Sequence, residues 1–149
     1  MSEKITGYID HVVFRNEENG YTVLRLRDGS GENVTVVGCP IVREADGLAK
    51  SSRNAYLSAE ERQAALVLSR AIFAGKAAVE AGERDAAALK ALMGGIIEAE
   101  PLARIDYVEV VDGVTMQPTD AIGAMALVAM AVYIGSTRLI DNFLYEEGE

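Results

Sequence analysis

The distribution of hydrophobic and polar residues divides the chain into a strand-rich beginning, a helical middle and a strand-rich end. At residues 5–14, 21–27 and 33–37, β-branched and aromatic residues are interleaved with polar ones. The polar runs between them contain Asn19-Gly20 and Asp28-Gly29. Short alternating runs bounded by such turn pairs are typical of antiparallel strands. The first 38 residues are therefore predicted to form a three-stranded meander.

The middle of the chain begins with a predicted amphipathic helix. Ser58 and Glu61 have the spacing of a capping box, in which each residue satisfies a free backbone N–H of the first turn. Apolar residues then recur near the 3.6-residue period, and Gly82 is a typical helix stop. One continuous helix is expected from Ser58 to about residue 81.

A second helix is predicted between Asp85, its N-cap, and Pro101. Its apolar residues have the spacing i, i+3, i+4, i+7 and i+8, so they are predicted to share one buried face: Leu89, Leu92, Met93, Ile96 and Ile97. We expect the Leu68/Ile72 and Leu92/Ile96 faces of the two helices to pack on the sheet. Replacing Leu92 by Ala should then cost roughly 2–5 kcal/mol of stability.

The end of the chain is predicted to return to strands, at residues 104–111, 125–134 and 137–143. The most apolar stretch, residues 121–135, is shorter than the ~20 residues that a membrane-spanning helix needs. It is interpreted as a buried strand or strand pair. The order of elements predicts an α+β fold, a mostly antiparallel sheet with two helices packed on it.

Composition narrows the choice of function. The chain has 149 residues, half of them hydrophobic, with 23 acidic against 14 basic side chains and a net charge of −9. This balance argues against a broad surface for nucleic acid or anionic membranes. The single cysteine, Cys39, excludes an internal disulfide and a cysteine-cluster metal site, and no signal-peptide pattern is present. A cytoplasmic protein is expected, and oligomer formation is compatible with the sequence.

The residue pattern with the most chemical content lies at 46–54. Lys50, Ser51, Ser52 and Arg53 place two cations and two hydroxyls in one glycine-containing loop. Hydroxyls donate to phosphate oxygens, Arg makes bidentate contacts, and Lys acts as a mobile point charge. The alternative is structural: serines that form a turn before a helix, followed by a surface arginine.

Several blocks in order resemble the C-terminal domain of the pantothenate synthetase (pantoate–β-alanine ligase) family, over residues 34–142. The blocks are Val36-Val37-Gly38-Cys39-Pro40-Ile41-Val42-Arg43-Glu44, Asp46-Gly47-Leu48-Ala49, Ser51-Ser52-Arg53-Asn54 with Tyr56-Leu57-Ser58, Ile105-Asp106-Tyr107-Val108-Glu109-Val110-Val111-Asp112 and Thr137-Arg138-Leu139-Ile140-Asp141-Asn142. The resemblance implies that the Ser-Ser-Arg loop clamps the phosphates of ATP, which brings Mg²⁺ with it. It also implies that the backbone near Val42 lies beside the adenine. Lys50 departs from the family, which more often has Met or Leu there.

The resemblance also implies a two-step reaction. The complete enzyme forms pantoyl-adenylate from pantoate and ATP, and the amine of β-alanine then displaces AMP. Those steps use a His-x-Gly-His motif and a pantoate pocket on a separate nucleotide-binding domain. This chain has one histidine, His11, in a predicted strand, where a structural role is favoured. We therefore expect negligible ligase activity from the chain alone, and possible completion by a separate nucleotide-binding domain in trans.

Residues 4–33 are similar to the N-terminal segment of RecD-like DNA helicases, chiefly in the run Phe14-Arg15-Asn16-Glu17-Glu18-Asn19-Gly20-Tyr21-Thr22-Val23. The motor is absent, because no Gly-x-x-x-x-Gly-Lys-Ser/Thr loop occurs. The sequence is thus interpreted as a chimera of a 1–38 β-segment and a 39–149 ATP-clamp domain. Two alternatives remain: a non-catalytic structural or interaction module, and a weak nucleic-acid binder that stacks bases on Tyr8, Phe14 and Tyr21.

Overall fold

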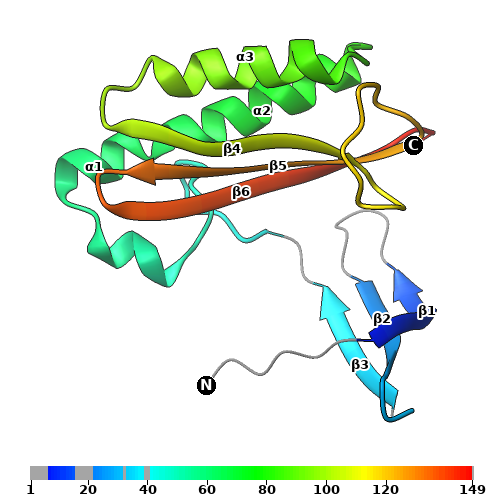
Figure 1. Cartoon of the computed structure of the whole chain (residues 1–149). Coiled ribbons are helices and arrows are strands. Elements are labelled where there is room, and N and C mark those ends of the chain that lie inside the picture. Colours follow the sequence, from blue (N-terminus) through cyan, green and yellow to red (C-terminus); the bar gives the residue numbers. More distant parts are fainter. Residues whose placement is uncertain (1–6, 16–21, 32, 39–40, 149) are drawn as a thin grey trace. The chain divides into compact units, whose positions relative to one another are not determined.

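The computed structural model describes residues 7–15, 22–31, 33–38 and 41–148. They form two compact units, Met1–Val42 and Arg43–Glu149 (Figure 1). Cys39 and Pro40, the predicted turn at 16–20 and the aromatic candidate Tyr21 lie outside the described residues. The assignment of a helicase-like segment and a ligase-like domain to 1–38 and 39–149 stays a prediction.

The first unit is a three-stranded antiparallel sheet. Strands β1 (Gly7–Arg15), β2 (Thr22–Asp28) and β3 (Asn33–Gly38) are paired in the order β1-β2-β3, as the alternation of the sequence predicts. The pairing of β2 with β3 joins Leu26 to Val34 and Leu24 to Val36, and β1 is interrupted by two register shifts. This sheet shares no strand pairing with the second one, so the described strands form two sheets rather than one.

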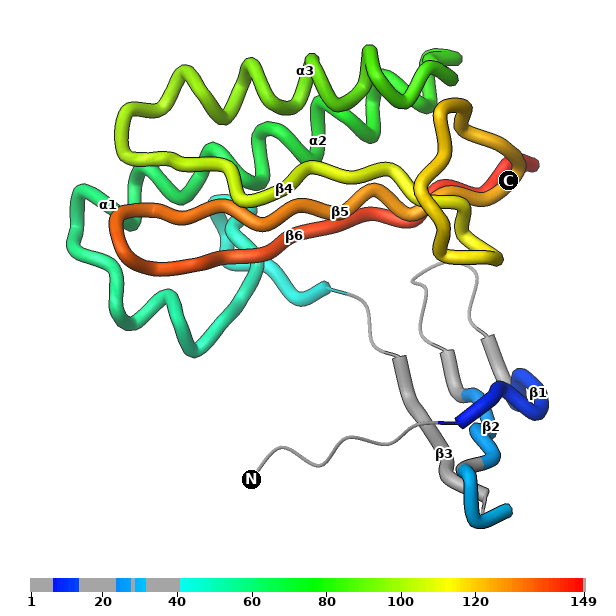
Figure 2. Tube along the Cα trace, viewed as in Figure 1, coloured from blue at the N-terminus to red at the C-terminus, as the bar shows by residue number. Residues whose placement is uncertain are grey.

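The second unit is a sheet covered on one face by helices. Its chain order is the 3₁₀ helix η1 (Ser52–Tyr56), α1 (Ala59–Ala64), α2 (Leu66–Glu80), α3 (Ala86–Glu98), β4 (Ala103–Asp112), β5 (Met125–Ile134) and β6 (Thr137–Glu146). The strands are antiparallel in the order β4-β5-β6. Figures 1 and 2 show α2 and α3 lying side by side over this sheet, with α3 against β4 and α2 against β6.

The predicted helix boundaries are confirmed at both caps. The Ser58 hydroxyl accepts from Glu61 N–H at 3.1 Å, and the Glu61 carboxylate accepts from Ser58 N–H at 2.8 Å, which completes the capping box. Asp85 caps α3 by accepting from two backbone N–H groups of its first turn. The prediction of one continuous first helix is wrong. It divides at Ala65, where Leu68 N–H bonds Ala65 C=O three residues back and tightens the turn.

The core lies between the helices and β5, the central strand. Alternate residues of β5 are fully or almost fully buried against the helices: Ala126, Val128, Met130, Val132 and Ile134. From α2, Leu68 and Ile72 are each 1% exposed, which confirms their predicted face. Gly75 allows α2 to approach α3 closely, because a Cβ there would lie 2.7 Å from Met93 Sδ.

The predicted face of α3 needs one correction. Leu89, Met93 and Ile97 are fully buried and Ile96 packs partly against the core, but Leu92 is 43% exposed. Successive helical residues are separated by about 100°, so Leu92 lies about 100° around the helix from Met93, the middle of the buried stripe. The apolar spacing therefore predicted the correct buried face of α3 but wrongly included Leu92 in it.

Replacing Leu89 by Ala should therefore lower the free energy of unfolding of the second unit by about 2–5 kcal/mol, because it leaves a cavity in a closed core. Leu92→Ala is the matched control, with the same change on the same helix, and should cost under about 1 kcal/mol. Urea denaturation followed by circular dichroism measures both. Equal losses would contradict the position of α3 on the sheet.

Candidate functional site

Residues 43–49 form a tight loop whose two ends pair through an isolated antiparallel bridge. Glu44 N–H donates to Leu48 C=O at 2.8 Å, and Gly47 N–H donates back to Glu44 C=O at 3.0 Å. Gly47 has a φ of +94°, in the left-handed region that favours glycine, and a Cβ there would lie 3.3 Å from the Phe73 ring. The sequence Asp-Gly-Leu-Ala therefore encodes a fixed loop.

A bidentate ion pair ties this loop to the sheet. The Arg43 guanidinium donates to the two carboxylate oxygens of Asp141 on β6, at 2.7 and 2.9 Å, and to Gly47 C=O at 3.1 Å. It also lies 5.0 Å from the centre of the Phe73 ring. The Asp141 side chain is only 1% exposed, so its charge depends on this partner. The start of the loop and the middle of β6 are thereby held together.

The next residues turn into η1 through local hydrogen bonds. The Ser51 hydroxyl accepts from Arg53 N–H at 3.2 Å, and Asn54 N–H donates to Ser51 C=O at 3.1 Å. The Asn54 side-chain amide donates to Ala49 C=O at 3.0 Å. The hydroxyl of Ser51 accepts in this turn, so its own hydrogen is left to donate to a ligand.

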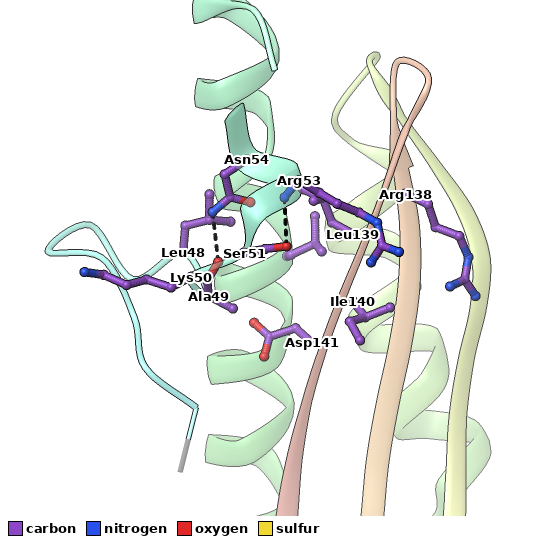
Figure 3. A pocket seen from close by; sticks show the side chains of 11 residues that line it. Leu48, Ala49, Lys50, Ser51, Arg53, Asn54, Arg138, Leu139, Ile140 and Asp141 are labelled. Carbon is purple, nitrogen blue, oxygen red and sulfur yellow. Dashed lines mark hydrogen bonds between the residues drawn. The ribbon is translucent and has the colours of Figure 1, made fainter. Parts of the chain in front are cut away.

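A pocket of about 170 Å³ lies between this turn and β6 (Figure 3). Buried leucines from the loop, α2 and β6 contribute to its lining, while Arg53 and Arg138 supply cations from opposite segments of the chain. The lining residues are Leu48, Ala49, Lys50, Ser51, Arg53, Asn54, Leu68, Arg138, Leu139, Ile140 and Asp141.

The three cations of the lining differ in how they are engaged. Arg138 donates to the Asp106 carboxylate through Nε at 2.9 Å and Nη2 at 2.7 Å. This hydrogen bond raises the pKa of Arg138 above its ordinary value. Lys50 extends away from Arg53 in Figure 3, and its Nζ lies 3.8 Å from Glu44. Among the described residues, the Arg53 guanidinium has no hydrogen-bond or ion-pair partner. Arg53 is thus the cation that is free to take an anion.

Comparison with known proteins identifies the lineage. The family model of pantoate-beta-alanine ligase matches residues 22–144, which is most of the chain. The chain belongs to the pantoate-beta-alanine ligase family. The match begins at residue 22, the first residue of β2. The sequence blocks had placed the start of the resemblance later, at residue 34. The helicase-like resemblance of residues 4–33 stays a prediction.

Individual relatives agree with the family. The chain is 59% identical over 113 residues to the pantothenate synthetase of Ruminiclostridium cellulolyticum, covering 76% of this chain and 40% of that protein. It is 53% identical over 124 residues to that of Heliobacterium modesticaldum, covering 83% and 44%. The crystal structure of pantothenate synthetase from Thermus thermophilus matches with a TM-score of 0.67 and 41% identity, covering 72% of this chain and 39% of that one.

The chain therefore spans about two fifths of the length of the pantothenate synthetases that it matches. The matches support its interpretation as the C-terminal domain of a ligase of this family, and the α+β fold agrees with the solved relative. Ligase lineage is established for the chain. The activity and ligands of the whole enzyme are considered below as proposals.

The structure places the residues singled out from the sequence in three different situations. Ser51 and Arg53 line the pocket together. Lys50 contributes to the lining although its ammonium extends away, and Ser52 is exposed in the first turn of η1, outside the lining. Val42 belongs to the other compact unit and is 62% exposed. The ligand contacts of all five residues remain predictions.

Two charged contributors to the pocket were not singled out as site residues from the sequence. Arg138 and Asp141 lie on β6, about 90 residues after the loop, and the ion pair of Asp141 with Arg43 spans 98 positions. Both belong to the Thr-Arg-Leu-Ile-Asp-Asn block that carried part of the resemblance to this ligase family. The available signal was the presence of two opposite charges, Arg138 and Asp141, within a predicted strand.

The other features considered from the sequence, such as His11, do not form a second functional site among the described residues. His11 is exposed in β1, with its Nδ1 3.0 Å from an Asp10 carboxylate oxygen, and this hydrogen bond lowers the pKa of Asp10. Within the described residues, no group of three or more His, Cys, Asp or Glu side chains is arranged to hold a metal ion. None of the described helices is both long and apolar enough to cross a membrane.

The ion pair of Arg43 with Asp141 should dominate the stability of the loop. Arg43→Ala leaves a buried carboxylate without its partner and should destabilise the second unit by about 3 kcal/mol. Arg62→Ala is the matched control, because Arg62 also pairs with an aspartate of the loop, Asp46, but at the surface. That change should cost under about 1 kcal/mol. Similar losses in thermal or urea denaturation would show that the buried pair has no special role.

Proposed function

We propose that this chain is the phosphate-clamping C-terminal domain of a pantoate–β-alanine ligase. In this function Ser51, Ser52 and Arg53 hold the phosphates of ATP while pantoate is converted to its adenylate. The observation that carries the proposal is that Arg53, whose guanidinium is unpartnered among the described residues, lines the same pocket as Ser51. Membership of the ligase family makes a nucleotide phosphate the best-supported ligand for that pair.

The proposed role of the Ser-Ser-Arg clamp is to stabilise negative charge on the phosphates as the reaction proceeds. When the pantoate carboxylate attacks the α-phosphorus, the bond to the bridging oxygen breaks and pyrophosphate leaves with the electron pair. Donors fixed where this charge develops stabilise the transition state without having to reorganise. Arg53 offers a planar fork of N–H donors, and Ser51 offers an O–H whose oxygen is already held by the Arg53 backbone.

The other predicted contacts supplement this centre. Lys50 is an exposed, weakly engaged ammonium, so turning its side chain toward a phosphate requires breaking only a 3.8 Å ion pair with Glu44. Val42 is proposed to lie beside the adenine. Mg²⁺ is proposed to arrive bound to ATP, held by phosphate oxygens.

We further propose that the chain has negligible ligase activity alone. Adenylate formation in this family uses a His-x-Gly-His motif and a pantoate pocket, and the 149 residues contain one histidine. Proximity and charge stabilisation both depend on those groups. The function needs a nucleotide-binding ligase domain as well, and we propose that such a domain can complete the site when it is supplied in trans.

ATP binding tests the clamp directly. Addition of about millimolar ATP with Mg²⁺ should shift the amide NMR signals of Ser51, Ser52 and Arg53. Arg53→Ala should weaken binding, measured by calorimetry, at least about tenfold, because it removes charge-assisted hydrogen bonds. Arg70→Ala, at an exposed position of α2 outside the pocket, is the matched control and should leave affinity unchanged.

Unchanged amide signals would reject the clamp and favour a structural or interaction module. Salt-dependent binding of single-stranded DNA by the same preparation would instead favour the nucleic-acid alternative, which the net charge of −9 opposes.

Complementation in trans tests the enzymatic part. The chain should release no AMP from ATP, pantoate and β-alanine by itself. AMP release should appear when the N-terminal domain of a pantothenate synthetase is added, and should fall strongly with the Arg53→Ala chain. Release of AMP by the unmixed chain above a no-enzyme control would overturn the proposed inactivity.

A further inference from the structure

The β4-β5-β6 sheet has a second face, and no helix of the second unit lies on it. The helices cover one face (Figures 1 and 2), where alternate residues of β5 are buried. Strand pairing places the intervening residues on the other side, in cross-strand rows. We call these residues the open face. From one end of the sheet to the other, its rows are Arg104-Tyr133-Arg138, Tyr107-Ala131-Ile140, Glu109-Ala129-Asn142 and Val111-Leu127-Leu144.

Much of the open face is apolar and exposed to solvent. Ile140 and Leu144 of β6 are 53% and 47% exposed. In the two inner rows β5 contributes only alanines, whose small side chains allow another sheet to approach closely. Glu109, the charged residue of the inner rows, already has a partner, because its carboxylate lies 3.5 Å from Lys90 Nζ of α3. A sheet with an apolar face is ordinarily stabilised by a second layer packed on that face.

The charges of the open face are separated along the strands. Arg104 and Arg138 lie in the row at one end, where Asp106 neutralises part of their charge through its ion pair with Arg138. At the opposite end, β6 leads into Glu146 and Glu147. One end of the face is therefore positive and the other is negative.

This separation of charge makes the open face complementary to a second copy of itself. When two copies pack face to face with their strands antiparallel, the positive end of each lies over the negative end of the other. With the strands parallel, the arginine rows would oppose each other and repel. A two-fold axis across the strands gives the antiparallel arrangement, and two-fold dimers are the commonest protein assemblies. The pattern therefore favours one partner and one orientation.

The size of the sheet limits the strength of such a dimer. Strands β4, β5 and β6 have ten residues each. With a rise of ~3.4 Å per residue and ~4.8 Å between strands, each copy would contribute roughly 500 Å² to the interface. A total of about 1,000 Å² is at the lower end of specific interfaces, where complexes are weak or transient. The dimer should therefore form at high protein concentration and dissociate on dilution.

We propose that the open face is a dimer interface, on which a second copy of this chain packs with its strands antiparallel. Leu144 and Ile140 supply apolar contacts, and Arg104 is a charge that sets the orientation. The proposal does not depend on ATP binding at the Ser-Ser-Arg turn.

The experiment is sedimentation velocity of the full chain from about 5 μM to about 500 μM, a range that covers weak dimers. The parent chain should change from monomer to dimer within this series. Leu144→Asp should remain monomeric throughout, because it buries a charge against the apolar part of the partner. Leu92→Asp is the matched control: Leu92 is 43% exposed, but it lies on α3 in the helical layer over the other face. This variant should dimerise like the parent chain.

A second pair of variants tests the orientation. Arg104→Glu should weaken dimerisation at least about tenfold, because it places a negative charge over the negative end of the partner. Arg70→Glu makes the same change in net charge at an exposed position of α2, and should leave the dimer unchanged.

A parent chain that stays monomeric over the whole range overturns the proposal. Persistence of the dimer in Leu144→Asp, or its equal loss in Leu92→Asp, would place the interface elsewhere. Equal effects of the two arginine variants would contradict the antiparallel orientation. Thermal denaturation verifies that each variant is folded, and Ile140→Asp repeats the test at the other exposed apolar residue if Leu144→Asp does not fold.

Discussion

The geometry of the pocket depends on the buried ion pair between Arg43 and Asp141. Burying a carboxylate is unfavourable unless its hydrogen-bonding capacity and charge are met, and here a bidentate guanidinium and the Asn142 N–H meet them. Because Arg43 also holds Gly47 C=O, the same side chain that neutralises Asp141 closes the loop. The position of the Ser-Ser-Arg turn over β6 therefore follows from an electrostatic requirement of the strand beneath it.

The sheet also positions residues of the pocket, through the register of its strands. The helices cover one face of β4-β5-β6, so alternate residues of β5 are buried and their neighbours face the other way. Such alternation fixes strand register, since a shift of one residue would expose the whole buried set. Along β6 the same alternation buries Asp141 on the face covered by the helices and puts Arg138 on the opposite face. The register of the strands therefore fixes both the packing of the core and the face of β6 on which each charged residue lies.

Much of this fold follows from local signals in the sequence. The capping box at Ser58, the aspartate cap at Asp85 and the alternation of the strands all predict elements that the structure contains. Local sequence signals do not predict features that depend on contacts with residues far away in the sequence. The exposure of Leu92 depends on which face of α3 packs on the sheet, and the break at Ala65 has no turn-forming residue to mark it.

The candidate site, like the fold, could be predicted from the sequence only in part. Its loop residues are contiguous and carry recognisable phosphate chemistry, so Ser51 and Arg53 can be proposed from sequence. Arg138 and Asp141 acquire their roles only when β6 is laid beside the loop, a juxtaposition that spans 98 positions in the case of Arg43 and Asp141. Spacing along a strand says which face a charge occupies, but not which distant segment covers that face.

The place of Arg43 in the chain has a consequence for modularity. It is the first residue of the second unit, directly after the boundary at Val42. Its guanidinium holds the buried Asp141 carboxylate and Gly47 C=O, so the second unit is anchored to its own sheet from its first residue. The conformation of the loop that leads to Ser51 is therefore set by contacts that lie entirely within the second unit.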